Sequence, residues 1–118
     1  MDTFENRLSA VRERMARACE RADRSPESVR LLPVTKTVEP ERIRQAVEAG
    51  LTVFGENRVQ EARRKIPLCP ARLEWHLIGH LQTNKVRLAV SLFSCIHSVD
   101  SLSLLETLEA ACARAGRR

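Results

Sequence analysis

The sequence predicts an α/β protein in which one N-terminal helix is followed by four βα units. Two observations predict it. Apolar residues near the N-terminus recur every three or four positions, and short apolar runs then alternate with helical stripes that glycine, proline or polar residues bound. Strands alternating with helices are typical of a parallel sheet with helical cover. Right-handed crossovers make this either an open doubly wound sheet or a βα barrel.

The first element is an amphipathic helix over about residues 2–23. Its stripe recurs at helical spacing and consists of Phe4, Leu8, Val11, Met15, Ala18 and Ala22. Ser25-Pro26 ends the helix, because the residue before a proline disfavours the α conformation. Arginines and acids interleave along this segment, as they do on a solvated helix face.

The first βα unit begins with Leu31–Lys36, which we expect to be a buried strand. Pro33 lies within it, and a proline is tolerated chiefly in edge strands or bulges. The helix that follows has Pro40 near its first turn and Gly50 past its end. Its apolar stripe consists of Ile43, Ala46 and Val47.

The three remaining units follow the same pattern. The expected strands are Leu51–Phe54, Leu73–Ile78 and Ser94–Ser98. The expected helices cover about 58–66, 82–92 and 101–116, with Asp100-Ser101 offering a cap for the last. Gly55–Asn57 and Gly79-His80 form turns after the first two of these strands.

Composition narrows the function classes. The 118 residues fit one domain, and 43% hydrophobic residues suffice for a core. The net charge is +5, but the first 30 residues mix seven arginines with six acids, and aromatic residues are only 3%. Platforms for stacking bases are therefore scarce, and we predict no nucleic-acid partner.

The cysteines and the N-terminus indicate a cytoplasmic location. Cysteines stand at positions 19, 69, 95 and 112, and no two form a C-x-x-C pair. We expect small, buried, reduced thiols. The N-terminal segment lacks the apolar core of a signal peptide, and no stretch approaches a membrane span, so we predict no membrane partner.

Lys36 is the most informative single residue. The chain has only three lysines, Lys36, Lys65 and Lys85, and arginine supplies the other positive charges. Lysine can form a Schiff base with a carbonyl compound, whereas arginine stays protonated. A lysine at the end of a buried strand could hold a carbonyl cofactor; an ordinary strand-end lysine reaching solvent is the equally weighted alternative.

Other candidates also follow predicted strands, where active residues of parallel α/β folds gather. Asn57 could cap the next helix or donate to a phenolate oxygen of a ligand. His80 could approach a ligand after Gly79 or bond to backbone in a loop. His97 is best explained as a core histidine. His76 and His80 straddle a strand end, so helical metal-ligand geometry is not expected and no metal site is predicted.

Four segments closely resemble the pyridoxal phosphate homeostasis protein family. They lie in order along most of the chain: 33–37, 54–61, 75–85 and 96–101, with the sequences PVTKT, FGENRVQE, WHLIGHLQTNK and IHSVDS. The two middle motifs are highly specific.

The resemblance implies both a fold and a function. It implies the N-terminal barrel of bacterial alanine racemase as the fold, and pyridoxal 5′-phosphate as the cofactor, held as a Schiff base on Lys36. Asn57 and His80 match family positions near that cofactor. Family members have no established turnover, so the resemblance implies a non-catalytic carrier or buffer in intracellular vitamin B6 homeostasis.

Length is the main departure from the family. A (β/α)8 TIM barrel needs eight units and about 250 residues, so residues 1–118 are expected to form a single incomplete cofactor-binding barrel domain. The phosphate-binding loops of the family lie in the half that is missing here. We therefore expect weak cofactor retention, and self-association or a complementing second half-barrel chain at the open sheet edges.

Two other functions stay open. The first is a pyridoxal-dependent, racemase-like enzyme, which would need a second acid/base group facing Lys36. The chain contains no tyrosine, so a racemase-like tyrosine cannot come from it. The second is a truncated, non-functional remnant that retains the motifs.

Overall fold

The computed structural model describes residues 3–118. The chain divides into two compact units, Met1–Leu31 and Leu32–Arg118. The described helices include none that is both long enough and apolar enough to cross a membrane.

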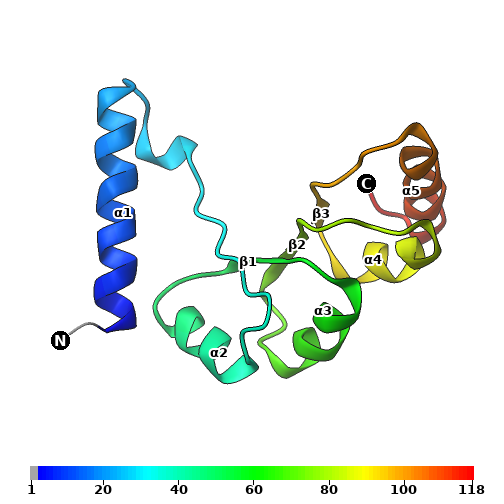
Figure 1. Ribbon diagram of the computed structural model, residues 1–118, viewed down its shortest axis with the longest axis horizontal. Helices are drawn as coiled ribbons and strands as arrows, with labels where there is room; N and C mark the ends of the chain where they lie inside the picture. The colour runs from blue at the N-terminus through cyan, green and yellow to red at the C-terminus, as the bar shows by residue number, and fades with distance from the viewer. Residues whose placement is uncertain (1–2) are drawn as a thin grey trace. The chain divides into compact units, whose positions relative to one another are not determined.

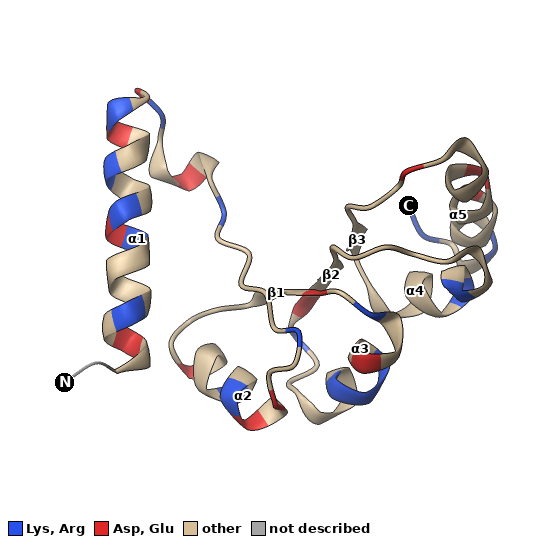
Figure 2. Cartoon of the chain, viewed as in Figure 1, with Lys and Arg blue, Asp and Glu red and all other residues tan. Residues whose placement is uncertain are grey.

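The N-terminal unit consists of helix α1 (Phe4–Arg21) and the 3-10 turn η1 (Pro26–Ser28) (Figure 1). Thr3 caps α1, because its side chain accepts a hydrogen bond of 3.1 Å from the Asn6 N–H. The predicted helix is confirmed, but Cys19 is its only buried residue. Arginines and glutamates interleave along α1 (Figure 2), as the sequence predicted.

The C-terminal unit is built on a parallel sheet of three strands in the order β1-β2-β3. The strands are β1 (Val53–Glu56), β2 (Glu74–Leu77) and β3 (Cys95–Ile96). Gly55 pairs with His76, and His76 pairs with Cys95. These three residues therefore form one row across the sheet.

Helices follow the strands along one side (Figure 1). They are α2 (Pro40–Glu48), α3 (Val59–Lys65), α4 (Val86–Leu92) and α5 (Leu102–Ala115), with 3-10 turns η2 (Ile66–Leu68) and η3 (Thr83–Lys85). Alternation along β2 buries Trp75 and Leu77 under the helices and turns Glu74 and His76 to the other face. We call that other face the open face.

The core lies between the sheet and the helices. The rings of Phe54 and Trp75 pack at a tilt with centroids 5.5 Å apart, and both side chains are buried. Burial of large apolar side chains is the main favourable contribution to the stability of such a unit. Within residues 3–118, every buried side-chain nitrogen or oxygen has a hydrogen-bond partner.

The prediction of a buried strand over Leu31–Lys36 is wrong. Only an isolated parallel bridge joins Val34 to Gly55, and Thr35 is the only buried residue of the segment. Pro33 explains part of this, since it lacks an N–H and contributes only a carbonyl, which accepts from the Gly55 N–H at 2.7 Å. The described residues thus form three strands and one bridge rather than four strands.

The next strand begins two residues later than predicted, at Val53. Leu51 instead closes the end of α2: Gly50 has φ 97°, and the Leu51 N–H donates to the Ala46 carbonyl at 3.2 Å. This is a Schellman-type helix end. The predicted helix over 82–92 begins as the 3-10 turn η3, whereas the Ser101 cap of α5 is confirmed, with its hydroxyl accepting from the Leu104 N–H at 3.1 Å.

Candidate functional site

Lys36 lies in the exposed segment that follows the Val34 bridge. Val34 is 48% exposed and Thr35 is 6% exposed, and Lys36 is exposed in the turn that follows them. The amine is therefore accessible to a ligand. This exposure agrees with the alternative of a lysine that reaches solvent and does not exclude Schiff-base formation.

The backbone on both sides of Lys36 is held in place. The Thr35 N–H donates to the Gly55 carbonyl at 2.9 Å, and the Thr37 N–H donates to Glu61 Oε2 at 2.6 Å. Thr37 has φ 62°, a left-handed conformation that is rare for a β-branched residue and persists only when surrounding contacts impose it. Lys36 thus projects from a fixed turn.

A buried ion network anchors this turn from the helix side. Lys65 and Glu56 are both fully buried, with Nζ and Oε2 3.2 Å apart. Lys65 also donates to the Thr35 carbonyl and pairs with Glu61 at 2.6 Å, and the Thr35 hydroxyl donates to Glu56. Buried charges of this kind persist only when paired and hydrogen-bonded.

The sequence analysis missed this network. One pattern could have found it: Lys65 stands three residues after Ala62 on the buried side of α3, where a solvated lysine is not expected. Through Glu61 the network also responds to protonation. The hydrogen bond from Lys65 lowers the pKa of Glu61 against the opposing effect of burial, and the Thr37 N–H lowers it further.

Asn57 and His80 come together at one cavity. Both line a pocket of about 210 Å³, together with Arg58, Val59, Gln60, Gln82 and Lys85. Asn57 follows β1 and His80 follows β2, so the two residues converge because neighbouring parallel strands end at the same edge. Lys36 is not among the lining residues, although it too follows a segment paired with β1.

Gly79 makes this convergence possible. A Cβ atom at Gly79 would lie 2.1 Å from the Asn57 carbonyl oxygen, so only glycine lets the two strand ends approach this closely. The Gly79 carbonyl in turn accepts a hydrogen bond from the Ser98 hydroxyl. The ends of β1, β2 and β3 are thereby tied into one rim.

Two purely structural roles that the sequence suggested, for Asn57 and His80, are wrong. Asn57 does not cap α3, because Arg58 occupies the N-cap position and the cap lacks a side-chain hydrogen bond. His80 is exposed and its Nδ1 lies 3.4 Å from Asp100 Oδ2. It pairs with an acid rather than with backbone.

The histidine and cysteine expectations also need correction. His97 is exposed rather than in the core, and its Nε2 lies 3.0 Å from His76 Nδ1. All four cysteines are free: Cys19 and Cys69 are buried, Cys112 is half-buried and Cys95 is exposed. Burial raises the pKa of the Cys69 thiol.

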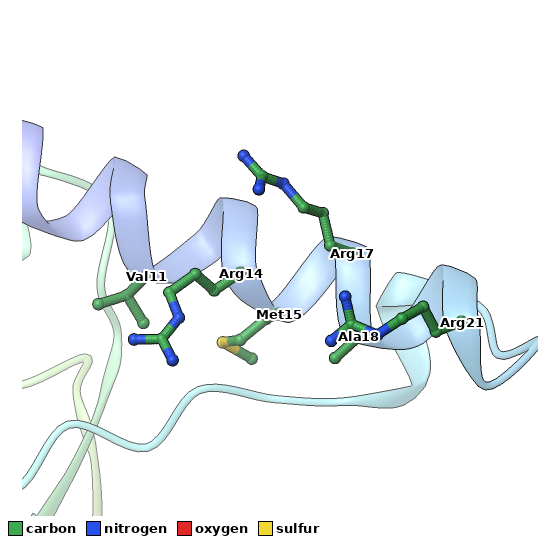
Figure 3. Close-up of a pocket in the computed structure, with 6 residues that line it drawn as sticks. All are labelled: Val11, Arg14, Met15, Arg17, Ala18 and Arg21. Carbon is green, nitrogen blue, oxygen red and sulfur yellow. The ribbon is translucent and has the colours of Figure 1, made fainter.

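A separate groove of about 470 Å³ runs along α1. Figure 3 shows its lining, which is Val11, Arg14, Met15, Arg17, Ala18 and Arg21. None of the predicted site residues belongs to it.

Comparison with known proteins gives close relatives. The chain is 48% identical over 104 residues to the pyridoxal phosphate homeostasis protein of Aquifex aeolicus, covering 87% of this chain and 46% of that protein. It is 41% identical over 112 residues to the protein of that name from Escherichia coli K12, covering 92% and 48%. The chain thus spans about half the length of the curated relatives it matches. No family model matches it.

Solved structures agree. PipY of Synechococcus elongatus PCC7942, solved with PLP bound, matches with a TM-score of 0.74 and 44% identity over 87% of this chain and 50% of that one. A protein of Bifidobacterium adolescentis described as unknown matches with a TM-score of 0.81 and 34% identity, covering 98% and 54%. With the motifs at 33–37, 54–61, 75–85 and 96–101, these similarities place the chain in the pyridoxal phosphate homeostasis protein family, over roughly the first half of its homologues' length.

Proposed function

We propose that the chain binds pyridoxal 5′-phosphate through Lys36 and serves in vitamin B6 homeostasis without turning over a substrate. The observation that carries the proposal is the position of Lys36: an exposed amine on a fixed turn, paired through its segment with β1, which also leads to Asn57. Family membership supplies the cofactor's identity, since a relative was solved with PLP bound.

The residues present fit the cofactor in part, with Lys36 as the amine and a neighbouring cavity lined by cations. When bound, pyridoxal phosphate supplies an aldehyde that condenses with an amine, so that the Lys36 nitrogen forms a C=N bond and one water leaves. Arg58 and Lys85 bring positive charge to the cavity that Asn57 and His80 line, which suits an anionic ligand. Asn57 can donate to a phenolate oxygen.

We further propose that residues 1–118 form a single incomplete cofactor-binding domain, roughly half of a (β/α)8 barrel. The open face leaves the cofactor exposed on one side. Retention is then weaker than in a closed barrel, and self-association or a complementing chain would improve it, because water exclusion strengthens polar contacts to the ligand.

An absorbance titration with pyridoxal phosphate tests the proposal. The wild-type chain is expected to give a saturable Schiff-base band that Lys36→Ala abolishes. Lys85→Ala is the matched control, because it removes another lysine and one cavity cation: the band should persist with weaker affinity. A band unchanged in Lys36→Ala would refute the role of Lys36.

Turnover is tested on the same samples. The chain loaded with cofactor is expected to leave L-alanine optically pure. Racemisation by the wild-type chain that is lost in Lys36→Ala would show that the chain is an enzyme rather than a carrier. A chain that folds cooperatively but never forms the band would be the remnant considered above.

A further inference from the structure

The open face carries a cluster of side chains that the proposed function does not use. His76 lies in β2, Cys95 is its register partner in β3, and His97 follows β3 with its N–H donating to the Leu77 carbonyl at 2.9 Å. The backbone of two hydrogen-bonded strands therefore fixes all three residues. Strand positions hold ligands more precisely than loops do.

The three side chains converge on one point. His76 Nδ1 lies 3.0 Å from His97 Nε2, and one ligand atom from each of the three residues lies within 4.8 Å of the other two. Tetrahedral Zn²⁺ places nitrogen ligands at about 2.0–2.1 Å and sulfur at about 2.3 Å from the metal. Ligand atoms of such a site are separated by roughly 3.3–3.6 Å. The histidine pair at 3.0 Å is near this spacing, and the remaining separations are at most 4.8 Å.

Glu74 orients His76 from behind. Its Oε2 lies 2.5 Å from His76 Nε2, and the carboxylate favours the tautomer with the proton on Nε2. The lone pair of Nδ1 then faces His97 Nε2, which lies 3.0 Å away. A carboxylate bonded to the distal nitrogen of a ligating histidine is a recurrent feature of zinc sites.

We propose that His76, Cys95 and His97 form a three-ligand site for Zn²⁺ or a similar borderline divalent cation. Two imidazoles and a thiolate are a donor set that suits this class of metal. Binding displaces the Cys95 thiol proton to solvent and forms a Zn–S bond. Three protein ligands leave a fourth coordination position for water or a small ligand.

The site is open to solvent. Cys95 and His97 are exposed, and the His76 side chain is 13% exposed. A metal can thus enter without opening the core. The competing explanation for the geometry is a plain hydrogen bond between the two imidazoles, which needs no cysteine and predicts no metal uptake.

Cobalt and zinc titrations of the full 118-residue chain, reduced and free of pyridoxal phosphate, distinguish these explanations. Co²⁺ is expected to bind one equivalent with a sulfur-to-cobalt charge-transfer band, and Zn²⁺ should displace it. Cys95→Ser should abolish the band, and His97→Gln should weaken affinity at least about tenfold, as the loss of a ligand does. Glu74→Gln should weaken affinity by about 10–100-fold.

Matched controls make the result decisive. Cys112→Ser removes another accessible thiol, and His80→Gln removes the exposed histidine that pairs with Asp100; both should bind metal as the wild type does. Circular dichroism checks that each variant is folded. No stoichiometric uptake, a band that survives Cys95→Ser, or a loss that follows Cys112 or His80 would overturn the site. Because no cofactor is present, failure here leaves the proposal for Lys36 untouched.

Discussion

Lys36 and Lys65 are the same residue type in opposite surroundings, one exposed and one fully buried. Lys65 is fully buried on the helix side, where Glu56, Glu61 and the Thr35 carbonyl satisfy its ammonium group. Lys36 is exposed one residue beyond Thr35. The comparison teaches that the covered side, where helices pack on the sheet, uses its charges to fix the backbone, while exposed nucleophiles stay available for ligands.

Removing the buried cation should have the largest effect. Lys65→Met leaves the Glu56 carboxylate buried without its ion partner, which we expect to lower the free energy of unfolding by about 3–5 kcal/mol. Urea denaturation measures it, with Lys85→Met as the control on a less buried lysine. The double variant Lys65→Met/Glu56→Gln should recover part of the loss. A single variant within about 1 kcal/mol of wild type would break the comparison, because the covered side would then not depend on its charges.

The second-largest loss of stability should come from a substitution at the rim of the open face. Gly79→Ala forces a methyl group against the Asn57 carbonyl, and overpacking of this kind costs about 3 kcal/mol. Gly50→Ala is the matched control: its Cβ would meet open space but φ is 97°, so we expect only about 1 kcal/mol. Equal losses in the two variants would show that the close approach of β1 and β2 is not what Gly79 provides.

Acid should lower the free energy of unfolding through Glu61, which belongs to the network around Lys65. The pKa of Glu61 in the folded chain lies below its ordinary value of 4.5, so its contribution to stability is fully present above about pH 4.5. That contribution is lost as the pH falls through the lower folded pKa. Unfolding free energies measured between pH 6 and pH 3 should fall more steeply for wild type than for Glu61→Gln; parallel curves would contradict the role given to Glu61.

The smallest effect we expect is a difference in reaction rate between an exposed thiol and a buried one. Cys95 is exposed on the open face, whereas Cys69 is buried and burial raises its pKa. We expect Cys95 to react with a thiol reagent about tenfold faster or more, because only the thiolate is nucleophilic. Mass mapping of the modified peptides during a time course measures both rates. Equal rates would mean that Cys95 and Cys69 do not differ in access.

Much of the covered side could be predicted from the sequence. Ile43, Ala46 and Val47 in α2 and the Ser101 cap of α5 follow from local periodicity and capping chemistry. The missed features depend on contacts between distant segments. Whether Leu31–Lys36 becomes a strand depends on its neighbours, and Gly55 supplies only one bridge.

The candidate site likewise has features that the sequence predicted and features that it did not. Position at the ends of strands predicted that Lys36, Asn57 and His80 would gather at one edge, and Asn57 and His80 do share a cavity. The Lys65 network and the contact between His76 and His97 were not predicted. The contact of Lys65 with Glu56 joins residues nine positions apart and that of His76 with His97 joins residues 21 apart, so both depend on how the segments pack together.

Lysine-resolved trapping tests the central claim most directly. The wild-type chain is mixed with pyridoxal phosphate and reduced with borohydride, and peptide mapping then quantifies the adduct at each of its three lysines. We predict that the adduct concentrates at Lys36 at low cofactor concentration, with little at Lys85 and none at buried Lys65. Equal modification of Lys36 and Lys85, rising in proportion to the cofactor without saturation, would contradict a built site at Lys36.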